Sequence, residues 1–446
     1  MHYTVYFSDP EITASKGFGK VAHLPCIFDS QPSYHRLGSE YLIDRGLGVW
    51  HPKLPQTLQP AAPPTDRTIL NYANWLANFL EWAEKRHIDI ITCTFHEHVY
   101  QRYQTELIRG YWSRDGKPLA PATVNSYVGA ACDFLTWMAY KGHRARFDIP
   151  SKTIVVNVAS PVSSRGHKRL TVEVREGTVR KNQTTMRMPS DDELQAWLAA
   201  VYAQHGCVRG LMCETVLMTA MRRSEIEAFR VDSIPLDPRR WHISNPTASD
   251  AEKLVRIQIQ FGTKGPSYGK DHGDKIGPKR SILVPLYLVK RLHQYREDAR
   301  LHQLNVWVKA VRGATQQHAR LAGAIHLFRD EASGIRLNGK HLYNAWTGVP
   351  LPFKGWSPHQ GRHWWACSVL WRELKQFDSV KKSEQDQITP VISHFAKDVI
   401  RLQIQPQLGH ASDDTSFIYL HWAMDMLGFA LPEQYRDYLD KESSSS

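Results

Sequence analysis

Apolar residues repeat with helical spacing in two blocks of this chain, and a long stretch without that repeat divides the blocks. In the first block they recur at steps of three and four, as one face of an α-helix requires: Ile69, Tyr72, Ala73, Leu76, Leu80 and Ala83, then Val124, Val128, Ala131, Leu135 and Met138. Pro121 suits the first turn of the second helix, where its missing N–H is not needed. We expect residues 65–150 to form a small helical bundle.

The segments on either side of this block have no strong period. Residues 1–64 end in a proline-rich stretch, so we expect an N-terminal extension and linker with room for a small accessory module. Residues 151–187 read as a basic interdomain connector with short strands at 154–158 and 170–174. An ordinary solvated linker explains this composition equally well. The basic residues of the connector that are candidates for contacting a polyanionic partner are Arg165, Lys168, Arg169, Arg180 and Lys181.

The second block begins with a helix-start signal. Ser190, followed three residues later by Glu193, forms a capping box. Helical pattern covers 194–203 and 211–229, and strand-like alternation covers 255–261 and 282–284, with an enlarged hairpin loop at 262–278 between the strands. We therefore expect a mainly α fold with a small antiparallel β-hairpin, an α+β domain over residues 188–431 and a frayed tail over 432–446.

The composition limits the partners and the compartment. A formal net charge of +12 over 446 residues favours a polyanionic partner, although solubility alone would also account for it. The six cysteines contain no C-x-x-C pair, which argues against a zinc ribbon or a disulfide framework. We see no apolar run of the roughly 20 residues that a membrane span needs. We expect a cytoplasmic protein with no membrane contact.

Four patches of the second block hold residues that suit phosphodiester chemistry. They are Arg222 with Glu225, which would share one helix face; Lys264 between Gly262 and Gly265; His359 with Arg362, one helical turn apart; and His410 with Tyr419. Each patch alone is more often structural than functional. Their common order within one domain favours a shared site.

This order and spacing resemble the catalytic domain of the tyrosine recombinase (phage integrase) family. The family motifs are T-G-x-R-x-x-E, a G-K-G hairpin, H-x-L-R-H, and L-G-H followed nine residues later by a tyrosine. Here the corresponding stretches are Thr219–Glu225, Gly262–Gly265, His359–His363, and Leu408–His410 followed by Tyr419. Leu327-Phe328 also matches, and residues 66–148 resemble the family's core-binding domain. The resemblance spans roughly residues 66–430.

Three departures from the family pattern stand out. Ala220 replaces a glycine, and Gly361 replaces the usual leucine. In shorter relatives the hairpin lysine lies four residues before an arginine, whereas here Lys264 and Arg280 are sixteen apart, so Lys270, Lys275 and Lys279 are rival candidates. We favour Lys264 because glycines flank it at the strand end.

The resemblance implies a role for each residue. Tyr419 would be the nucleophile, and Arg222 and Arg362 would bind the non-bridging phosphate oxygens. Lys264 would be the general acid, His359 would assist proton transfer, His410 would hydrogen-bond the phosphate, and Glu225 would support Arg222. The implied partners are double-stranded DNA and further copies of the chain, a dimer on each site and a tetramer in synapsis, with accessory directionality factors as further candidates.

Neither a metal nor a cofactor is expected. Guanidinium groups would neutralise the phosphate, and His359 and His363 lack the intervening Glu of H-E-x-x-H. The loop 265–271 is one residue short of a P-loop and ends in Asp, so ATP binding is rejected. Two alternative functions are a type IB topoisomerase and a DNA-binding regulator that does not cleave.

Overall fold

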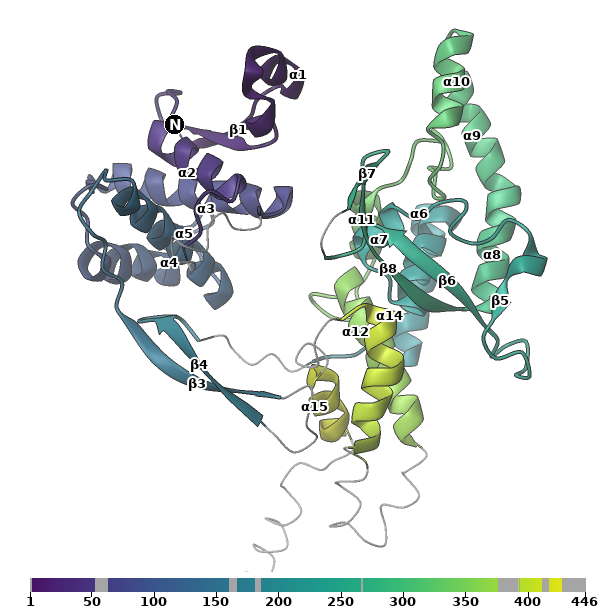
Figure 1. The fold of residues 1–446 in the computed structure, drawn as a ribbon. Helices are drawn as coiled ribbons and strands as arrows, with labels where there is room; N and C mark the ends of the chain where they lie inside the picture. Colours follow the sequence, from purple (N-terminus) through teal and green to yellow (C-terminus); the bar gives the residue numbers. More distant parts are fainter. Residues whose placement is uncertain are drawn as a thin grey trace, which may run out of the picture. The chain divides into compact units, whose positions relative to one another are not determined.

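The computed structural model describes residues 2–52, 63–159, 167–180, 186–265, 268–375, 392, 394–410 and 417–426. The chain divides into two compact units: residues 1–158 with 167–184, and residues 159–166 with 185–446. Helices predominate, and the strands form small sheets (Figure 1). The expected fold class, mainly α with a small antiparallel sheet, is confirmed. No helix within the described ranges is long and apolar enough to cross a membrane.

The first unit is a helical bundle with two small sheets. Its elements are β1 (Thr4–Phe7), α1 (Pro10–Thr13), η1 (Ala14–Phe18), η2 (Gly19–Val21), β2 (Pro25–Phe28), α2 (Arg36–Gly46), α3 (Asp66–Lys85), η4 (Phe95–Gln104), α4 (Thr105–Arg109), α5 (Pro121–Tyr140), β3 (Ser151–Ala159) and β4 (His167–Arg175). The apolar stripes expected at 69–83 and 124–138 lie on α3 and α5 and face the core, and Pro121 is at the first turn of α5.

The N-terminal segment differs from the separate extension expected for residues 1–64. Ile27, Tyr41 and Leu42 are buried in the same core as α3 and α5. The Tyr41 ring packs on Trp137 of α5, whose indole N–H donates to Asp44 at 2.9 Å. The reason is that these apolar residues are too few for a core of their own and find one on the bundle. The linker residues 53–62 lie outside the described residues.

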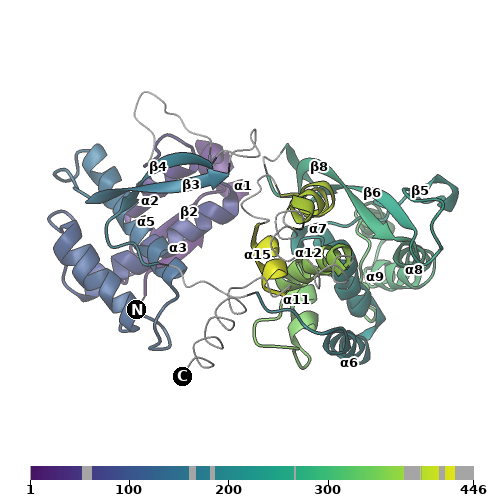
Figure 2. The same ribbon diagram turned by 90° about the horizontal axis from the view of Figure 1, so that it is seen from below.

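The described parts of the connector hold more structure than the sequence indicates. The short strands expected at 154–158 and 170–174 lie within β3 and β4, which pair in one two-stranded sheet (Figure 2). After β4 the chain docks on the bundle, where the Gln104 side chain donates to the Gly177 carbonyl at 2.8 Å. The Asn125 side chain bonds both the N–H and the carbonyl of Val179, at 3.0 and 2.8 Å. These long-range hydrogen bonds have no sequence signal.

The second unit carries a four-stranded antiparallel sheet with helices around it. Its elements are α6 (Asp191–Thr219), α7 (Arg223–Glu227), η5 (Pro238–Arg240), β5 (His242–Ile243), β6 (Leu254–Phe261), β7 (Gly269–Asp271), β8 (Asp274–Pro285), α8 (Leu286–Glu297), α9 (Ala299–Lys309), α10 (Ala314–Ala322), α11 (Gly339–Thr347), α12 (Pro358–Leu374), η7 (Ile400–Ile404), α14 (Gln405–Leu408) and α15 (Phe417–Met426). The strand order is β5-β6-β8-β7.

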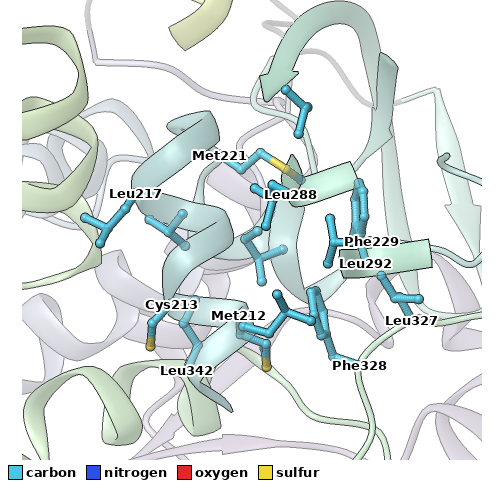
Figure 3. Close-up of a cluster of buried hydrophobic side chains, with 14 of the residues drawn as sticks. Met212, Cys213, Leu217, Met221, Phe229, Leu288, Leu292, Leu327, Phe328 and Leu342 are labelled. Carbon is cyan, nitrogen blue, oxygen red and sulfur yellow. The ribbon is translucent and has the colours of Figure 1, made fainter. Parts of the chain in front are cut away.

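The core of this unit lies between one face of the sheet and the helices. Alternate residues of β6 are buried, including Val255, Ile257 and Ile259, because successive strand side chains point to opposite faces. Figure 3 shows side chains from several helices and loops gathered in this core, among them Met212, Leu217, Met221, Phe229, Leu288, Leu292 and Phe328.

The enlarged hairpin holds more structure than the loop expected at 262–278. β8 begins at Asp274, and β7 pairs with its first residues. Buried Asp274 anchors this extension, since it binds the His326 ring and, at 2.6 Å, the Arg336 guanidinium. Burial raises the pKa of Asp274, but hydrogen bonds from His326 and Arg336 outweigh it and the pKa is lowered.

Helix α6 begins at the expected capping box and is kinked at Gly206. The Ser190 hydroxyl accepts from the Glu193 N–H at 3.2 Å, and the Glu193 carboxylate accepts from the Ser190 N–H at 2.9 Å. Gly206 has φ 84° and ψ 174°, a conformation that only glycine adopts readily. Glu331 accepts from the Val208 N–H at 2.9 Å and so caps the part of the helix beyond the kink.

We predict that Gly206→Ala lowers the unfolding free energy of the second unit by about 1–3 kcal/mol, because the backbone conformation becomes strained. A Cβ at this position would also lie 2.2 Å from Glu331 Oε2. Urea denaturation measures the change. The control is Gly323→Ala, at φ −81° with no atom closer than 3.4 Å to the added Cβ, which should change stability by less than about 0.5 kcal/mol. Equal effects of the two substitutions would contradict the prediction.

Candidate active site

The turn between α6 and α7 places Arg222 at the start of a helix. α6 ends because Ala220 adopts a left-handed conformation, with φ 54°. The expectation of continuous helix across Arg222 and Glu225 was wrong, since Arg222 is the N-cap of α7. The contact between them forms nevertheless: the Arg222 N–H donates to Glu225 Oε2 at 2.7 Å, and its Nη1 donates to Oε1 at 3.0 Å. A Glu at the third helical position reaches back to the N-cap.

Glu225 is a buried carboxylate shared by two guanidinium groups. It is 0% exposed. Arg280 of β8 donates to it from Nε at 3.1 Å and from Nη2 at 2.5 Å, opposite Arg222. Burial raises the pKa of Glu225, but the charges and hydrogen bonds of Arg280 and Arg222 outweigh this and lower it. Glu225 therefore stays ionised and holds both arginines.

Three successive backbone carbonyls at the end of α14 hold three guanidinium groups. The last carbonyls of a helix have no partner within the helix and carry a partial negative charge, so they suit cations. Each accepts from a different arginine: Gln407 from Arg280, Leu408 from Arg362 at 2.9 Å, and Gly409 from Arg222 at 2.9 Å. Gly409 ends the helix at φ 63°, where a Cβ would lie 2.8 Å from Arg280 Cδ. The helix end thus sets the spacing of the arginines.

The Gln407 side chain fastens this helix end to the sheet. It is 4% exposed, and its Oε1 accepts from the Leu283 N–H of β8 at 2.8 Å. Its Nε2 donates to the carbonyls of Leu283 and of Thr219, the last residue of α6, each at 2.9 Å. Since Leu283 lies beyond the part of β8 that β7 covers, Gln407 pairs with the strand edge as a neighbouring strand would.

Helix α12 carries His359 and Arg362 one turn apart, as expected. It begins with Ser357 as N-cap and Pro358 in the first turn. Arg362 is 5% exposed and also donates to the carbonyl of Ala220. Burial, followed by the charge of Arg222, lowers the pKa of Arg362 to about 9, so this guanidinium remains charged at neutral pH.

The glycine at position 361 makes room for a tryptophan. A Cβ on Gly361 would lie 2.5 Å from the ring of Trp346 and 3.3 Å from Leu217. Trp346 is buried and contacts the rings of Trp197 and Trp356. A larger residue at 361 would displace this aromatic cluster, which explains the departure from the family pattern.

Tyr419 lies in the interior, beside His363 of α12. It is 1% exposed, and its phenol oxygen lies 3.0 Å from Nδ1 of His363. Nε2 of His363 in turn lies 3.2 Å from Nε2 of His359. Burial raises the pKa of Tyr419, and the charge of Arg362 opposes this rise. Burial and then the charges of His359 and Arg362 lower the pKa of His363 to about 4.

Lys264 lies in the turn after β6 and is exposed. This turn is attached to the arginine cluster, since the Ser224 hydroxyl donates to the Gly262 carbonyl at 2.7 Å. Burial and then the charges of Arg362, Arg222 and Lys264 lower the pKa of His359. Lys275 instead donates to the Gly265 carbonyl at 2.7 Å and supports the turn.

His410 follows the carbonyl cluster directly. Its ring is parallel to that of Tyr419, with centroids 6.4 Å apart and an interplanar angle of 6°. Burial and then the charges of Arg362 and Arg222 lower the pKa of His410 to about 4. The imidazole is therefore neutral at neutral pH and able to act as a hydrogen-bond donor or acceptor.

The structure thus brings together Arg222, Glu225, Lys264, His359, Arg362, His410 and Tyr419 from distant parts of the chain. Sequence reasoning missed three further members: Arg280, Gln407 and His363. The signal for His363 was available, because it lies one helical turn after His359 on the same face. Arg280 and Gln407 have no comparable signal, because their partners are far away in the sequence.

The connector residues proposed to contact DNA are only partly described. Arg165 and Lys181 lie outside the described residues, whereas Lys168 and Arg169 lie in β4. Arg180 is exposed next to Val179, which is docked on the bundle. Their role in binding stays a prediction.

No protein-family model and no curated protein matches the chain. The chain resembles several solved structures at low identity. The Tn1549 transposon integrase in complex with circular intermediate DNA is 11% identical, with a TM-score of 0.45, and the match covers 86% of this chain and 94% of that one. The XerH site-specific recombinase bound to difH substrate is 17% identical, with a TM-score of 0.41, and covers 82% and 79%.

A lambda integrase dimer bound to a core site is 12% identical, with a TM-score of 0.40, and the match covers 80% of this chain and 89% of that one. At TM-scores below 0.5, these likenesses are too distant to assign a function.

We predict that Gln407→Leu lowers the unfolding free energy of the second unit by about 2–4 kcal/mol, because it leaves buried backbone groups of Leu283 and Thr219 without partners. Gln403→Leu makes the same chemical change at an exposed position of η7 and is the control. Thermal or urea unfolding measures both. A loss no larger than that of the control would show that Gln407 does not fasten the helix end.

Proposed function

We propose that this protein is a site-specific tyrosine recombinase of a mobile genetic element. It cuts and rejoins double-stranded DNA through a covalent 3′-phosphotyrosine on Tyr419. The observation that carries the proposal is that two guanidinium groups, Arg222 and Arg362, are held on adjacent carbonyls, and that the next residue, His410, lies with its ring parallel to that of Tyr419. This set of groups suits attack on a phosphodiester.

Arg222 and Arg362 neutralise the non-bridging oxygens of the scissile phosphate. Within the cluster of Arg222, Arg280, Arg362 and Glu225, three positive charges face one negative charge, so two positive charges remain for an anion. A planar guanidinium group can donate two hydrogen bonds to the oxygens of one phosphate. Because these donors are already held in place, they need little reorganisation in the transition state. Arg280 serves mainly to hold Glu225 against the helix end.

Lys264 protonates the leaving 5′-oxygen. It is exposed on a turn that hydrogen bonds from Ser224 of α7 and from Lys275 hold in place. An ammonium group is a suitable acid for an alkoxide leaving group. His410 hydrogen-bonds the phosphate, since it directly follows the carbonyl that binds Arg222.

The partners follow from the motif order and from the net charge of +12. DNA phosphates release counterions when a basic protein neutralises them, which favours binding. We propose a dimer on each recombination site, a tetramer with a Holliday junction in synapsis, and action in the cytoplasm on the nucleoid. Accessory directionality factors are further candidate partners.

We predict that Tyr419→Phe binds DNA as the wild type does but forms no covalent adduct, because Phe keeps the packing and lacks the nucleophilic oxygen. The probe is a pool of random-sequence duplexes, each with a nick that lets the short 5′-hydroxyl fragment diffuse away and so traps the phosphotyrosine. Denaturing gels measure the adduct, and Tyr287→Phe of α8 is the matched control.

Each outcome of that experiment decides between functions. An adduct that persists in Tyr419→Phe would remove Tyr419 from the role. Wild-type protein that binds the duplexes and forms no adduct would indicate a regulator that does not cleave. Adducts without site preference, together with relaxation of supercoiled plasmid, would indicate a type IB topoisomerase.

We predict that Lys264→Ala slows cleavage of a duplex selected from that pool by about 10²–10⁴-fold, the usual contribution of a general acid. Sulfur in place of the bridging 5′-oxygen leaves without a proton, so such a substrate should restore the rate close to that of the wild type. The control is Lys279→Ala, an exposed lysine of the same hairpin. An equally slow reaction of Lys264→Ala on the sulfur substrate would exclude the acid role.

A further inference from the structure

Three side chains from two helices form a continuous hydrogen-bonded chain in the second unit. Tyr419 of α15 lies against α12, with its phenol oxygen 3.0 Å from His363 Nδ1. The other nitrogen of the same ring, Nε2, lies 3.2 Å from His359 Nε2. His359 is exposed, whereas Tyr419 is 1% exposed. The chain therefore connects a buried phenol to the surface.

Hydrogen-bonding chemistry gives this chain a direction. A phenol that donates to Nδ1 of His363 requires that nitrogen to be bare, so the proton of the neutral imidazole is on Nε2. That Nε2–H donates to His359 Nε2, which must also be bare, and the proton of His359 is then on Nδ1. Burial and neighbouring cations lower the pKa of both histidines, which keeps them neutral at neutral pH.

The buried phenol needs such a proton acceptor. Burial raises the pKa of Tyr419 above that of an ordinary tyrosine, so phenolate is almost absent at neutral pH. Arg362 and Arg222 are cations and take up no proton, and Lys264 is required in its protonated form as the acid. His363 is a neutral base already in contact with the phenol oxygen.

We propose that His363 is a catalytic residue, the base that takes the proton of Tyr419 as the phenol attacks. This inference rests on the proposed function. The Tyr419 oxygen forms its bond to phosphorus while the bond from phosphorus to the 5′-oxygen breaks. The phenol proton passes to Nδ1 of His363, and the Nε2 proton of His363 passes to Nε2 of His359. The leaving 5′-oxygen takes its proton from Lys264. In total, His359 gains one proton and Lys264 loses one.

This relay gives His359 a positive charge at the moment when negative charge develops on the phosphate. His359 lies one helical turn before Arg362 on α12. The positive charge that develops on His359 therefore adds to the stabilisation by Arg222 and Arg362 in the transition state, and it is absent in the ground state. In rejoining, the same protons move in the opposite direction.

The test compares variants of His363 in single-turnover cleavage of the selected duplex. In His363→Asn, the amide oxygen can accept the phenol hydrogen bond from about the position of Nδ1, yet it cannot take up a proton. We expect His363→Asn and His363→Ala to cleave about 10²–10⁴-fold more slowly than the wild type, with DNA affinity unchanged. Added imidazole should accelerate His363→Ala. The bridging-sulfur substrate should restore neither variant, in contrast to Lys264→Ala. His318→Asn, an exposed histidine of α10, is the matched control.

The outcomes separate this inference from the proposed function. If the wild type forms an adduct and His363→Asn cleaves within a few-fold of it, His363 only positions the phenol and the inference is overturned. Absence of any wild-type adduct would instead overturn the proposed function.

A second measurement needs no variant, so it remains decisive if His363→Asn or His363→Ala fails to fold. Long-range proton–nitrogen correlation spectra of wild-type protein with ¹⁵N-labelled histidine should show His363 protonated on Nε2 and His359 on Nδ1. The opposite tautomer of His363 would overturn the inference.

Discussion

Three guanidinium groups can lie side by side in this protein because the carbonyls at the end of one helix separate them and offset part of their repulsion. Like charges a few ångströms apart in a protein interior repel by several kcal/mol at an effective dielectric constant of about 20. The carbonyls of Gln407, Leu408 and Gly409 each accept one guanidinium, and buried Glu225 bridges two of them. The arginines therefore keep their places without a ligand, and the cluster retains a net positive charge for one.

The rest of the site depends on how this helix end is attached. Gln407 bonds the edge of β8 and the last residue of α6, so the elements that carry Arg280 and Arg222 are fixed to the one that binds them. A long-range hydrogen bond also attaches the turn that carries Lys264, because Ser224 of α7 donates to this turn. The long insertion in the hairpin is compatible with this because Asp274 anchors it separately, on His326 and Arg336.

In the proposed mechanism, different residues of the site donate and accept protons. Burial and, after it, the charges of neighbouring groups such as Arg362 lower the pKa of His359, His363 and His410, and so keep the three imidazoles neutral beside the arginines. A neutral imidazole accepts a proton and an ammonium group donates one. The two proton transfers that phosphodiester cleavage needs are thus assigned to different groups, without a metal ion in the proposed mechanism.

The sequence by itself predicted several of the helices, one strand and a set of candidate site residues. Periodicity predicted α3, α5 and β6, the capping box predicted the start of α6, and motif order predicted the residues from Arg222 to Tyr419, because each of these signals lies within a few neighbouring residues. Only the tertiary structure decided that Arg222 precedes a helix, that residues 2–52 share the bundle core, and that Arg280, Gln407 and His363 belong to the site. These outcomes depend on contacts such as that of Gln407 with Thr219, across 188 residues, which leave no periodic trace in either partner.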